Sequence, residues 1–94
     1  MNIEKLKRNF EGSGEVKGFT FSQELETDKG YIYKVNDKYF EVFEKKSVPL
    51  CIDFEKKVYS ETDFKEQYPK ARHFGKWAWT VSSFDKGLKI LNEL

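Results

Sequence analysis

Apolar positions at both ends of the chain recur at the spacing of an amphipathic helix. Near the N-terminus, Ile3, Leu6 and Phe10 stand at positions i, i+3 and i+7, and Gly12 follows them as a stop signal. This pattern predicts a short N-terminal helix over residues 2–10.

The second helical pattern lies at the C-terminus, where Phe84, Leu88 and Leu91 repeat at i, i+4 and i+7. Ser82 and Asp85 have the spacing of a capping box at the point where this apolar stripe begins. The pattern predicts a C-terminal helix that packs across the rest of the domain.

Between the two predicted helices, apolar and polar residues alternate as they do in half-buried strands. Phe19 and Phe21 are separated by the polar Thr20, and residues 31–35 and 39–44 continue the alternation. Two turn signals separate the strands. The first is Asp28-Lys29-Gly30, in which Gly30 is expected to have a positive φ. The second is Asn36-Asp37, two residue types that tolerate the left-handed region. The pattern predicts a three-stranded antiparallel meander.

The rest of the chain predicts further strands. Pro49 suits the first residue of a strand or an edge strand, and Leu50, Ile52 and Phe54 would form one face of this fourth strand. The remaining elements expected are, in order, a short strand at 58–59, one or two helical turns over residues 60–68 that end at Pro69, and a last strand in which Trp77, Trp79 and Val81 share a face.

These elements together predict an α+β fold. The chain has 94 residues, which is the length of one small domain, and no repeat, linker or low-complexity tract divides it. We therefore expect a single small domain over residues 1–94. It would consist of an antiparallel meander sheet of about five strands, with an N-terminal helix and a C-terminal helix packed on it.

Aromatic residues make up 17% of the chain, and the strand pattern places them on both faces of the sheet. Tyr31 and Tyr33 share a face of one strand, and Tyr39, Glu41 and Phe43 share a face of the next. One face of an antiparallel sheet is normally solvated. The surplus aromatic rings would therefore be covered by the second helix, enclosed in a barrel, or presented to a partner.

Charge patterning argues against a strong long-range field. Lys and Arg number 17 and Asp and Glu number 16, which leaves a formal net charge of +1, and Lys far outnumbers Arg. No segment approaches the roughly 20 apolar residues of a membrane span, and the N-terminus lacks the apolar run of a signal peptide. We expect a cytoplasmic protein with no membrane partner.

Residues that could carry catalysis or bind a metal are few. A single Cys51 excludes an intramolecular disulfide, and Cys51 with the single His73 cannot complete a zinc site without other ligands. The enzyme hypothesis that remains is a small enzyme with Cys51 as nucleophile and His73 as base. Because a lone cysteine and a lone histidine are mostly packing or surface residues, we expect no enzymatic activity, no metal and no cofactor.

The most basic window of the chain, residues 65–79, also contains aromatic residues. Its basic residues are Lys65, Lys70, Arg72 and Lys76, and its aromatic residues are Tyr68, His73, Phe74, Trp77 and Trp79. Lysines that contact phosphates and rings that stack on bases are typical of single-strand nucleic-acid binding. A solvated turn beside core tryptophans has the same composition, so both interpretations stay open.

Taken together, these features predict a non-enzymatic binding or protein-interaction module that uses an aromatic-rich sheet surface. Its partner would be another protein or a second copy of the chain, as in a homodimer. The alternative is a small nucleic-acid-binding accessory protein that uses residues 65–79. The candidate binding residues are Tyr31, Tyr33, Lys70, Arg72, Phe74, Lys76, Trp77 and Trp79.

Overall fold

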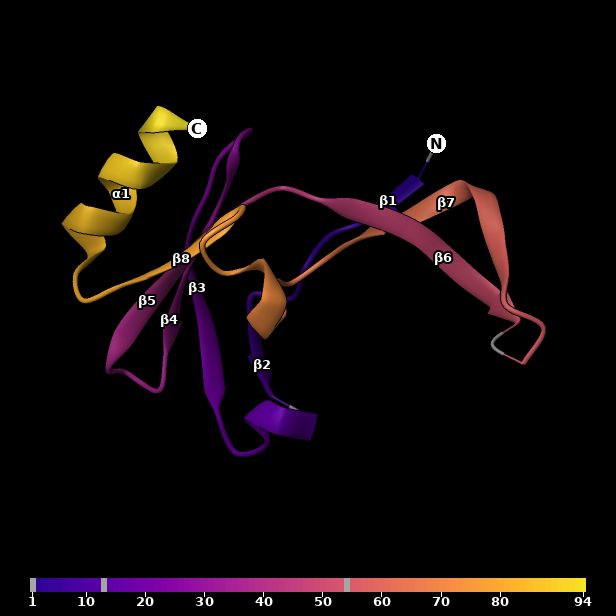
Figure 1. Ribbon diagram of the computed structural model, residues 1–94, viewed down its shortest axis with the longest axis horizontal. Coiled ribbons are helices and arrows are strands. Elements are labelled where there is room, and N and C mark those ends of the chain that lie inside the picture. Colours follow the sequence, from indigo (N-terminus) through magenta and orange to yellow (C-terminus); the bar gives the residue numbers. More distant parts are fainter. Residues whose placement is uncertain (1, 13, 54) are drawn as a thin grey trace.

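Two β-sheets and one α-helix make up the fold, which the computed structural model describes for residues 2–12, 14–53 and 55–94 (Figure 1). The elements are, in chain order, β1 (Asn2–Glu4), β2 (Asn9–Glu11), the 3-10 helix η1 (Gly14–Val16), β3 (Thr20–Glu26), β4 (Gly30–Val35), β5 (Tyr39–Glu44), β6 (Ser47–Asp53), β7 (Val58–Glu66), the 3-10 helix η2 (Ala71–His73), β8 (Ala78–Val81) and α1 (Phe84–Glu93). One sheet has five strands in the order β2-β3-β4-β5-β8, all antiparallel, and the other has three in the order β1-β7-β6. A five-stranded antiparallel sheet and a C-terminal helix are present as predicted, but the strands predicted around Leu50 and at 58–59 belong to the three-stranded sheet instead.

The predicted N-terminal helix is wrong, because residues 2–10 contribute to two separate sheets. β1 pairs in parallel with β7, and β2 pairs antiparallel with β3. In the second pair Phe10 lies opposite Phe21, and their rings stack with centroids 4.7 Å apart. A helix this short is marginal in water by itself. Strand pairing and ring stacking therefore decide the local structure.

The helical turns predicted over residues 60–68 are also wrong, since most of this segment belongs to β7, which pairs with β6. Ser60 Oγ accepts hydrogen bonds from the backbone N–H groups of Thr62, at 3.2 Å, and Asp63, at 2.8 Å. This is the local contact of a helix N-cap. Here the contact lies at an irregularity in the pairing of β6 with β7, and the chain on either side of it remains paired with β6 as a strand.

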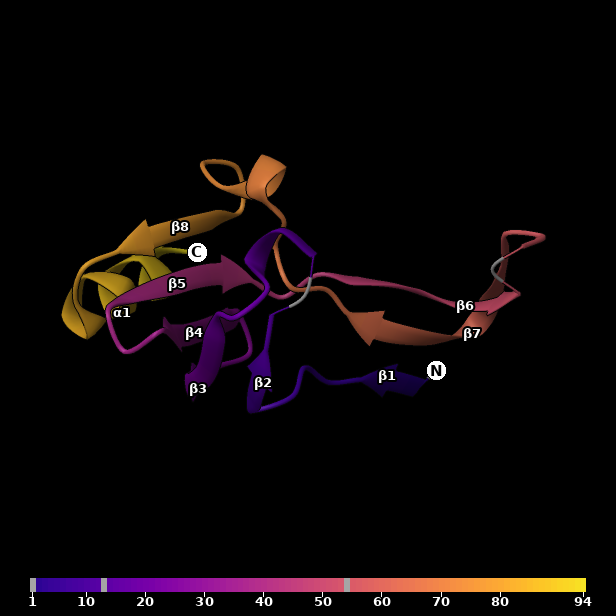
Figure 2. The same cartoon turned by 90° about the horizontal axis from the view of Figure 1, so that it is seen from below.

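The helix α1 covers one face of the five-stranded sheet (Figures 1 and 2). The core on this side consists of Ile32, Val42 and Leu91, all of them buried. Ser83, rather than the predicted Ser82, caps the helix, since its Oγ accepts a hydrogen bond of 3.3 Å from the N–H three residues later. In the described part of the chain, no helix is both long and apolar enough to cross a membrane.

The opposite face of the same sheet carries the aromatic cluster, with Phe21, Tyr31, Tyr33 and Phe43 at its centre. Among the described residues no second α-helix covers this face. The cover comes from the N-terminal segment and from the chain between β7 and β8, which includes η2 (Figure 1). The half-buried residues that pack against the cluster are Leu6, Phe10, Phe19, Tyr39, Tyr68, Phe74 and Trp77, of which Tyr39 belongs to the sheet itself.

The three-stranded sheet forms an arm that extends from the five-stranded sheet (Figures 1 and 2), and the longest axis of the molecule spans 42 Å. Pro49 lies in β6, which is an edge strand of the arm, as predicted. Ile52 and Tyr59 on the arm are 68% and 54% exposed. Phe54, which the sequence pattern assigns to the face of Ile52, lies outside the described residues.

Two tight connections order the central strands. Asn36 and Asp37 have φ values of 53° and 56°, so the predicted left-handed turn is confirmed. The prediction of a positive φ at Gly30 is wrong. Gly30 is required for a different reason, since a Cβ atom at this position would overlap the backbone carbonyl of Phe43 on the neighbouring strand.

Candidate binding cavity

A cavity of about 850 Å³ opens on the aromatic face of the five-stranded sheet. Its volume lies within the range of sites that hold small molecules. The rings that line it belong to Phe10, Phe19, Phe21, Tyr39, Tyr68 and Phe74. The charged residues in its lining are Glu11, Glu41, Lys70 and Arg72. The cavity is therefore a mainly aromatic hollow with a small number of charged groups.

Strand pairing and ring packing hold the aromatic wall in place. Phe10 on β2 stacks on Phe21 of β3, and the ring of Tyr68 meets both edge-on, with centroids 5.5 and 5.2 Å away. Edge-to-face contacts of this kind stabilise aromatic groups beyond the burial of their surface. Pro69 is buried directly after Tyr68 and fixes the backbone where the chain crosses the sheet. The wall is thus held in place by contacts within the chain.

Glu41 places a carboxylate on this aromatic face. It lies on β5 between Tyr39 and Phe43, whose side chains share its face. Tyr68 Oη donates a hydrogen bond of 2.6 Å to Glu41 Oε1. Burial raises the pKa of Glu41, and the hydrogen bond from Tyr68 partly opposes that rise. No lysine or arginine of the described chain forms an ion pair with this carboxylate.

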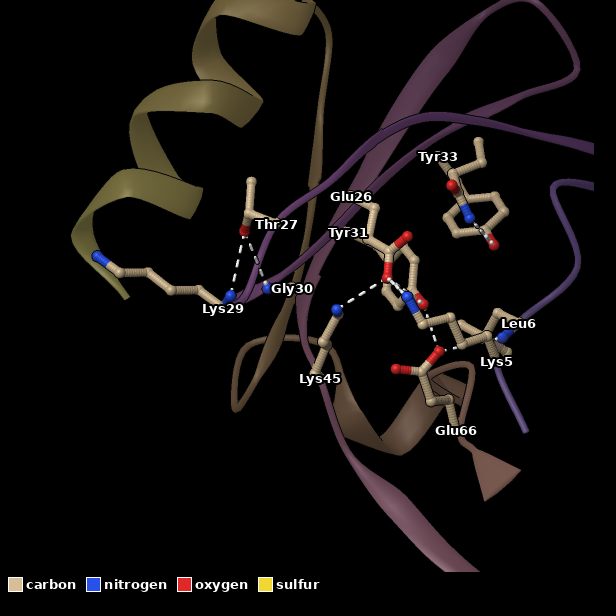
Figure 3. Close-up of polar contacts among 11 residues, drawn as sticks. Lys5, Leu6, Glu26, Thr27, Lys29, Gly30, Tyr31, Tyr33, Lys45 and Glu66 are labelled. Carbon is tan, nitrogen blue, oxygen red and sulfur yellow. Dashed lines mark hydrogen bonds and ion pairs between the residues drawn. The ribbon is translucent and has the colours of Figure 1, made fainter. Parts of the chain in front are cut away.

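A second charged cluster lies where the arm joins the five-stranded sheet (Figure 3). Glu26 Oε2 lies 2.9 Å from Lys45 Nζ and 2.9 Å from Lys5 Nζ, and hydrogen bonds from these two lysines lower the pKa of Glu26 to about 2. Tyr31 Oη donates a hydrogen bond to Glu66, which also accepts one of 3.1 Å from a backbone N–H of the N-terminal segment. These groups are partners of one another, so we assign this cluster a structural role in fastening the arm to the sheet.

Tyr31 and Tyr33, two of the predicted binding residues, are 1% and 0% exposed. Tyr33 Oη donates a hydrogen bond of 2.7 Å to the carbonyl oxygen of Lys7 and accepts one of 3.0 Å from Gln23 Nε2. The ring of Tyr68 covers Tyr33, with centroids 5.3 Å apart. The expected exposed tyrosine surface is therefore corrected, because returning chain packs over these rings and makes them core residues.

Three other predicted binding residues do come together at the cavity. Lys70, Arg72 and Phe74 all line it, contributed by η2 and the residues on either side of it. Lys70 and Arg72 are exposed, whereas Phe74 is half-buried against the aromatic cluster. This part of the basic tract thus borders a hollow that the sheet forms.

The remaining predicted residues lie elsewhere. Trp77 packs on the aromatic cluster, and the centroid of its ring lies 4.7 Å from that of the His73 ring. Trp79 pairs with Val42, which places it on the helix side of the sheet. The two tryptophans do not share a face, because β8 begins only after Trp77. Lys76 is exposed and lies in the turn before β8, outside the cavity lining.

The structure does not bring Cys51 and His73 together. Cys51 is exposed on β6 of the arm, where it pairs with Tyr59 of β7. His73 lies in η2 over the five-stranded sheet, and its Nδ1 accepts a hydrogen bond of 2.9 Å from the N–H of Lys70. Among the residues that the structure describes, no group of three or more His, Cys, Asp or Glu side chains could hold a metal ion.

Sequence reasoning missed the hydrogen-bonded pair in the cavity lining, Glu41 and Tyr68. A signal for Glu41 was present, because a carboxylate between Tyr39 and Phe43 interrupts an otherwise aromatic strand face. Tyr68 stood out in the sequence only as one aromatic residue of the basic window, and nothing local indicated its contact with Glu41, which joins residues 27 positions apart.

Comparisons with known proteins add no information about this site. No family model matches the chain, and neither the curated proteins nor the solved structures contain a significant match. Any functional conclusion therefore depends on the geometry of the chain itself.

Proposed function

We propose that the protein is a non-enzymatic binding module and that its ligand occupies the aromatic cavity. The observation that supports this proposal is the cavity of about 850 Å³ on the sheet face, lined mainly by aromatic rings and bordered by a few charged groups. Apolar pockets with a small number of convergent polar groups are the usual form of ligand sites. The ligand would still bind to the aromatic face of the sheet, but it would contact the residues of the cavity lining instead of Tyr31 and Tyr33, which are buried.

Titration with a neutral, environment-sensitive apolar dye, phenylnaphthylamine, tests the proposal. We expect saturable fluorescence enhancement, and we expect amide NMR shifts to be concentrated at Phe19, Tyr39 and Phe74. Ala71→Trp places a large ring in the lining and should abolish binding. Ile52→Ser, at an exposed position of the arm, is the matched control and should leave binding unchanged.

The outcome that contradicts the proposal is equally specific. Dye binding that survives Ala71→Trp, or NMR shifts confined to the arm, would show that the cavity is not the site. A salt-sensitive shift with a single-stranded oligonucleotide that perturbs Lys70, Arg72 and Lys76 would instead support the nucleic-acid alternative.

A further inference from the structure

Two carboxylates on this side of the protein, Glu26 and Glu41, have different hydrogen-bond partners. Glu26 Oε2 lies 2.9 Å from each of two lysine Nζ atoms, whereas Glu41 Oε1 accepts a hydrogen bond of 2.6 Å from the hydroxyl of Tyr68. In the described part of the chain no lysine or arginine nitrogen lies within ion-pair distance of Glu41. A half-buried carboxylate without a cation carries a desolvation cost, which here raises the pKa of Glu41. A cationic ligand would relieve that cost.

The rings around the carboxylate complement the same kind of ligand. Phe19, Tyr39 and Phe74 line the cavity together with Glu41. Aromatic faces attract cations within roughly 6 Å of the ring centre. The reduced dielectric of a partly enclosed site also strengthens the attraction between a cation and a carboxylate. Next to Glu41 itself, an anionic group would be repelled, and a neutral group would leave the charge of this carboxylate unmatched.

In the part of the chain that the structure describes, no lysine or arginine forms an ion pair with Glu41, so a cationic ligand could take this place. Lys70 and Arg72 belong to the cavity lining, but both are exposed, and neither pairs with Glu41. Glu41 therefore faces a hollow large enough to admit a cation that comes from outside the chain.

We propose that the cavity binds an organic cation of the alkylammonium class, with the nitrogen against Glu41 and its alkyl groups against the surrounding rings. This inference rests on the proposed function, since it assumes that the cavity is the ligand site. It adds the chemical class of the ligand and assigns Glu41 as the residue that selects it.

The test compares choline with its uncharged isostere, in which a quaternary carbon replaces the nitrogen. Each is titrated into isotope-labelled protein, and binding is followed by NMR shifts of the cavity residues. We expect choline to bind about tenfold more tightly than the isostere. Glu41→Gln keeps an acceptor for Tyr68 and removes the charge, so it should weaken choline about tenfold and leave the isostere unaffected.

Glu24→Gln makes the same change of net charge at an exposed position outside the cavity lining. It should leave both affinities within about twofold of wild type, because exposed charges at a distance are screened. Equal affinities for choline and the isostere in the wild-type protein, or a choline affinity that Glu41→Gln leaves unchanged, would overturn the inference while leaving the cavity as a site. Absence of binding by both compounds would also overturn it, and the dye titration decides separately on the proposed function. If Glu41→Gln fails to fold, the wild-type affinity ratio alone gives the answer.

Discussion

Gly87 of α1 faces Val42 of β5 so closely that a methyl group on Gly87 would lie 2.8 Å from Val42 Cγ2. The same methyl group would lie 3.4 Å from Val81 and 3.5 Å from Ile32. Glycine within a helix costs about 1 kcal/mol relative to alanine. Here that cost is offset by closer packing, because the missing side chain lets the helix approach the sheet.

Gly87→Ala should therefore destabilise the protein, although alanine is the better helix former. Overpacking typically costs about 1–3 kcal/mol, and the gain in helix propensity returns about 1 kcal/mol, so we expect a net loss of about 1 kcal/mol. Urea unfolding at neutral pH measures the change in the free energy of unfolding. Lys89→Ala, at an exposed position of the same helix, should change it by less than about 0.5 kcal/mol. A Gly87→Ala variant more stable than wild type would contradict this interpretation.

Those parts of the fold whose local signals agree with their tertiary setting could be predicted from sequence. Strand β5 was predicted with its observed bounds, Tyr39–Glu44, and the left-handed turn at Asn36 was predicted from residue type. The two helices that were predicted wrongly, at residues 2–10 and 60–68, lie in segments where a local helical signal competes with a partner strand distant in sequence. Pairing of β1 with β7 joins the two segments, and no local pattern reveals it.

The candidate site was predictable in part for the same reason. Lys70, Arg72 and Phe74 lie in one short stretch, so their composition alone drew attention to them. Between Glu41 and Tyr68 the chain runs through both long strands of the arm, β6 and β7, before it returns to the five-stranded sheet, so the sequence does not show that the two side chains are in contact. Exposure of Tyr31 could not be judged from alternation, because alternation assigns a face without saying what covers it.

Removal of the Tyr68 hydroxyl should destabilise the protein. In Tyr68→Phe the ring contacts with Phe10 and Phe21 can remain, but Glu41 loses its 2.6 Å hydrogen bond. We expect the free energy of unfolding at neutral pH to fall by about 1 kcal/mol, the low end of the cost of a polar group left without its partner, because Glu41 is only half-buried.

The pH dependence of this loss has a definite sign. The folded-state pKa of Glu41 is raised, so its ionisation weakens folding as the pH rises through that value. Loss of the Tyr68 bond raises the pKa further, and the difference between Tyr68→Phe and wild type should be larger at neutral than at acid pH. Tyr59→Phe, at an exposed tyrosine, should show little change at either pH. A loss that is the same for both variants would contradict a specific role for the Tyr68–Glu41 contact.

At the junction of the arm with the sheet, the ionised Glu26 should stabilise the protein, and acid should remove this stabilisation, which is the opposite of its effect at Glu41. Hydrogen bonds from Lys45 and Lys5 lower the pKa of Glu26 from 4.5 to about 2. The stabilisation from ionised Glu26 is therefore fully present above pH 4.5 and is lost as the pH falls through about 2. Because Lys5 is 66% exposed and its charge is screened, we expect Glu26→Gln to cost about 1 kcal/mol at neutral pH.

Urea unfolding of wild type and Glu26→Gln across this acid range checks the expectation. The difference between them should shrink as the pH falls from 4.5 toward 2. Added salt at neutral pH should reduce it too, since both ion pairs are partly exposed to solvent. Glu24→Gln, at an exposed position, is the matched control and should follow wild type throughout. If the cost of Glu26→Gln stayed constant over the whole pH range, packing of the side chain rather than its charge would hold the arm to the sheet.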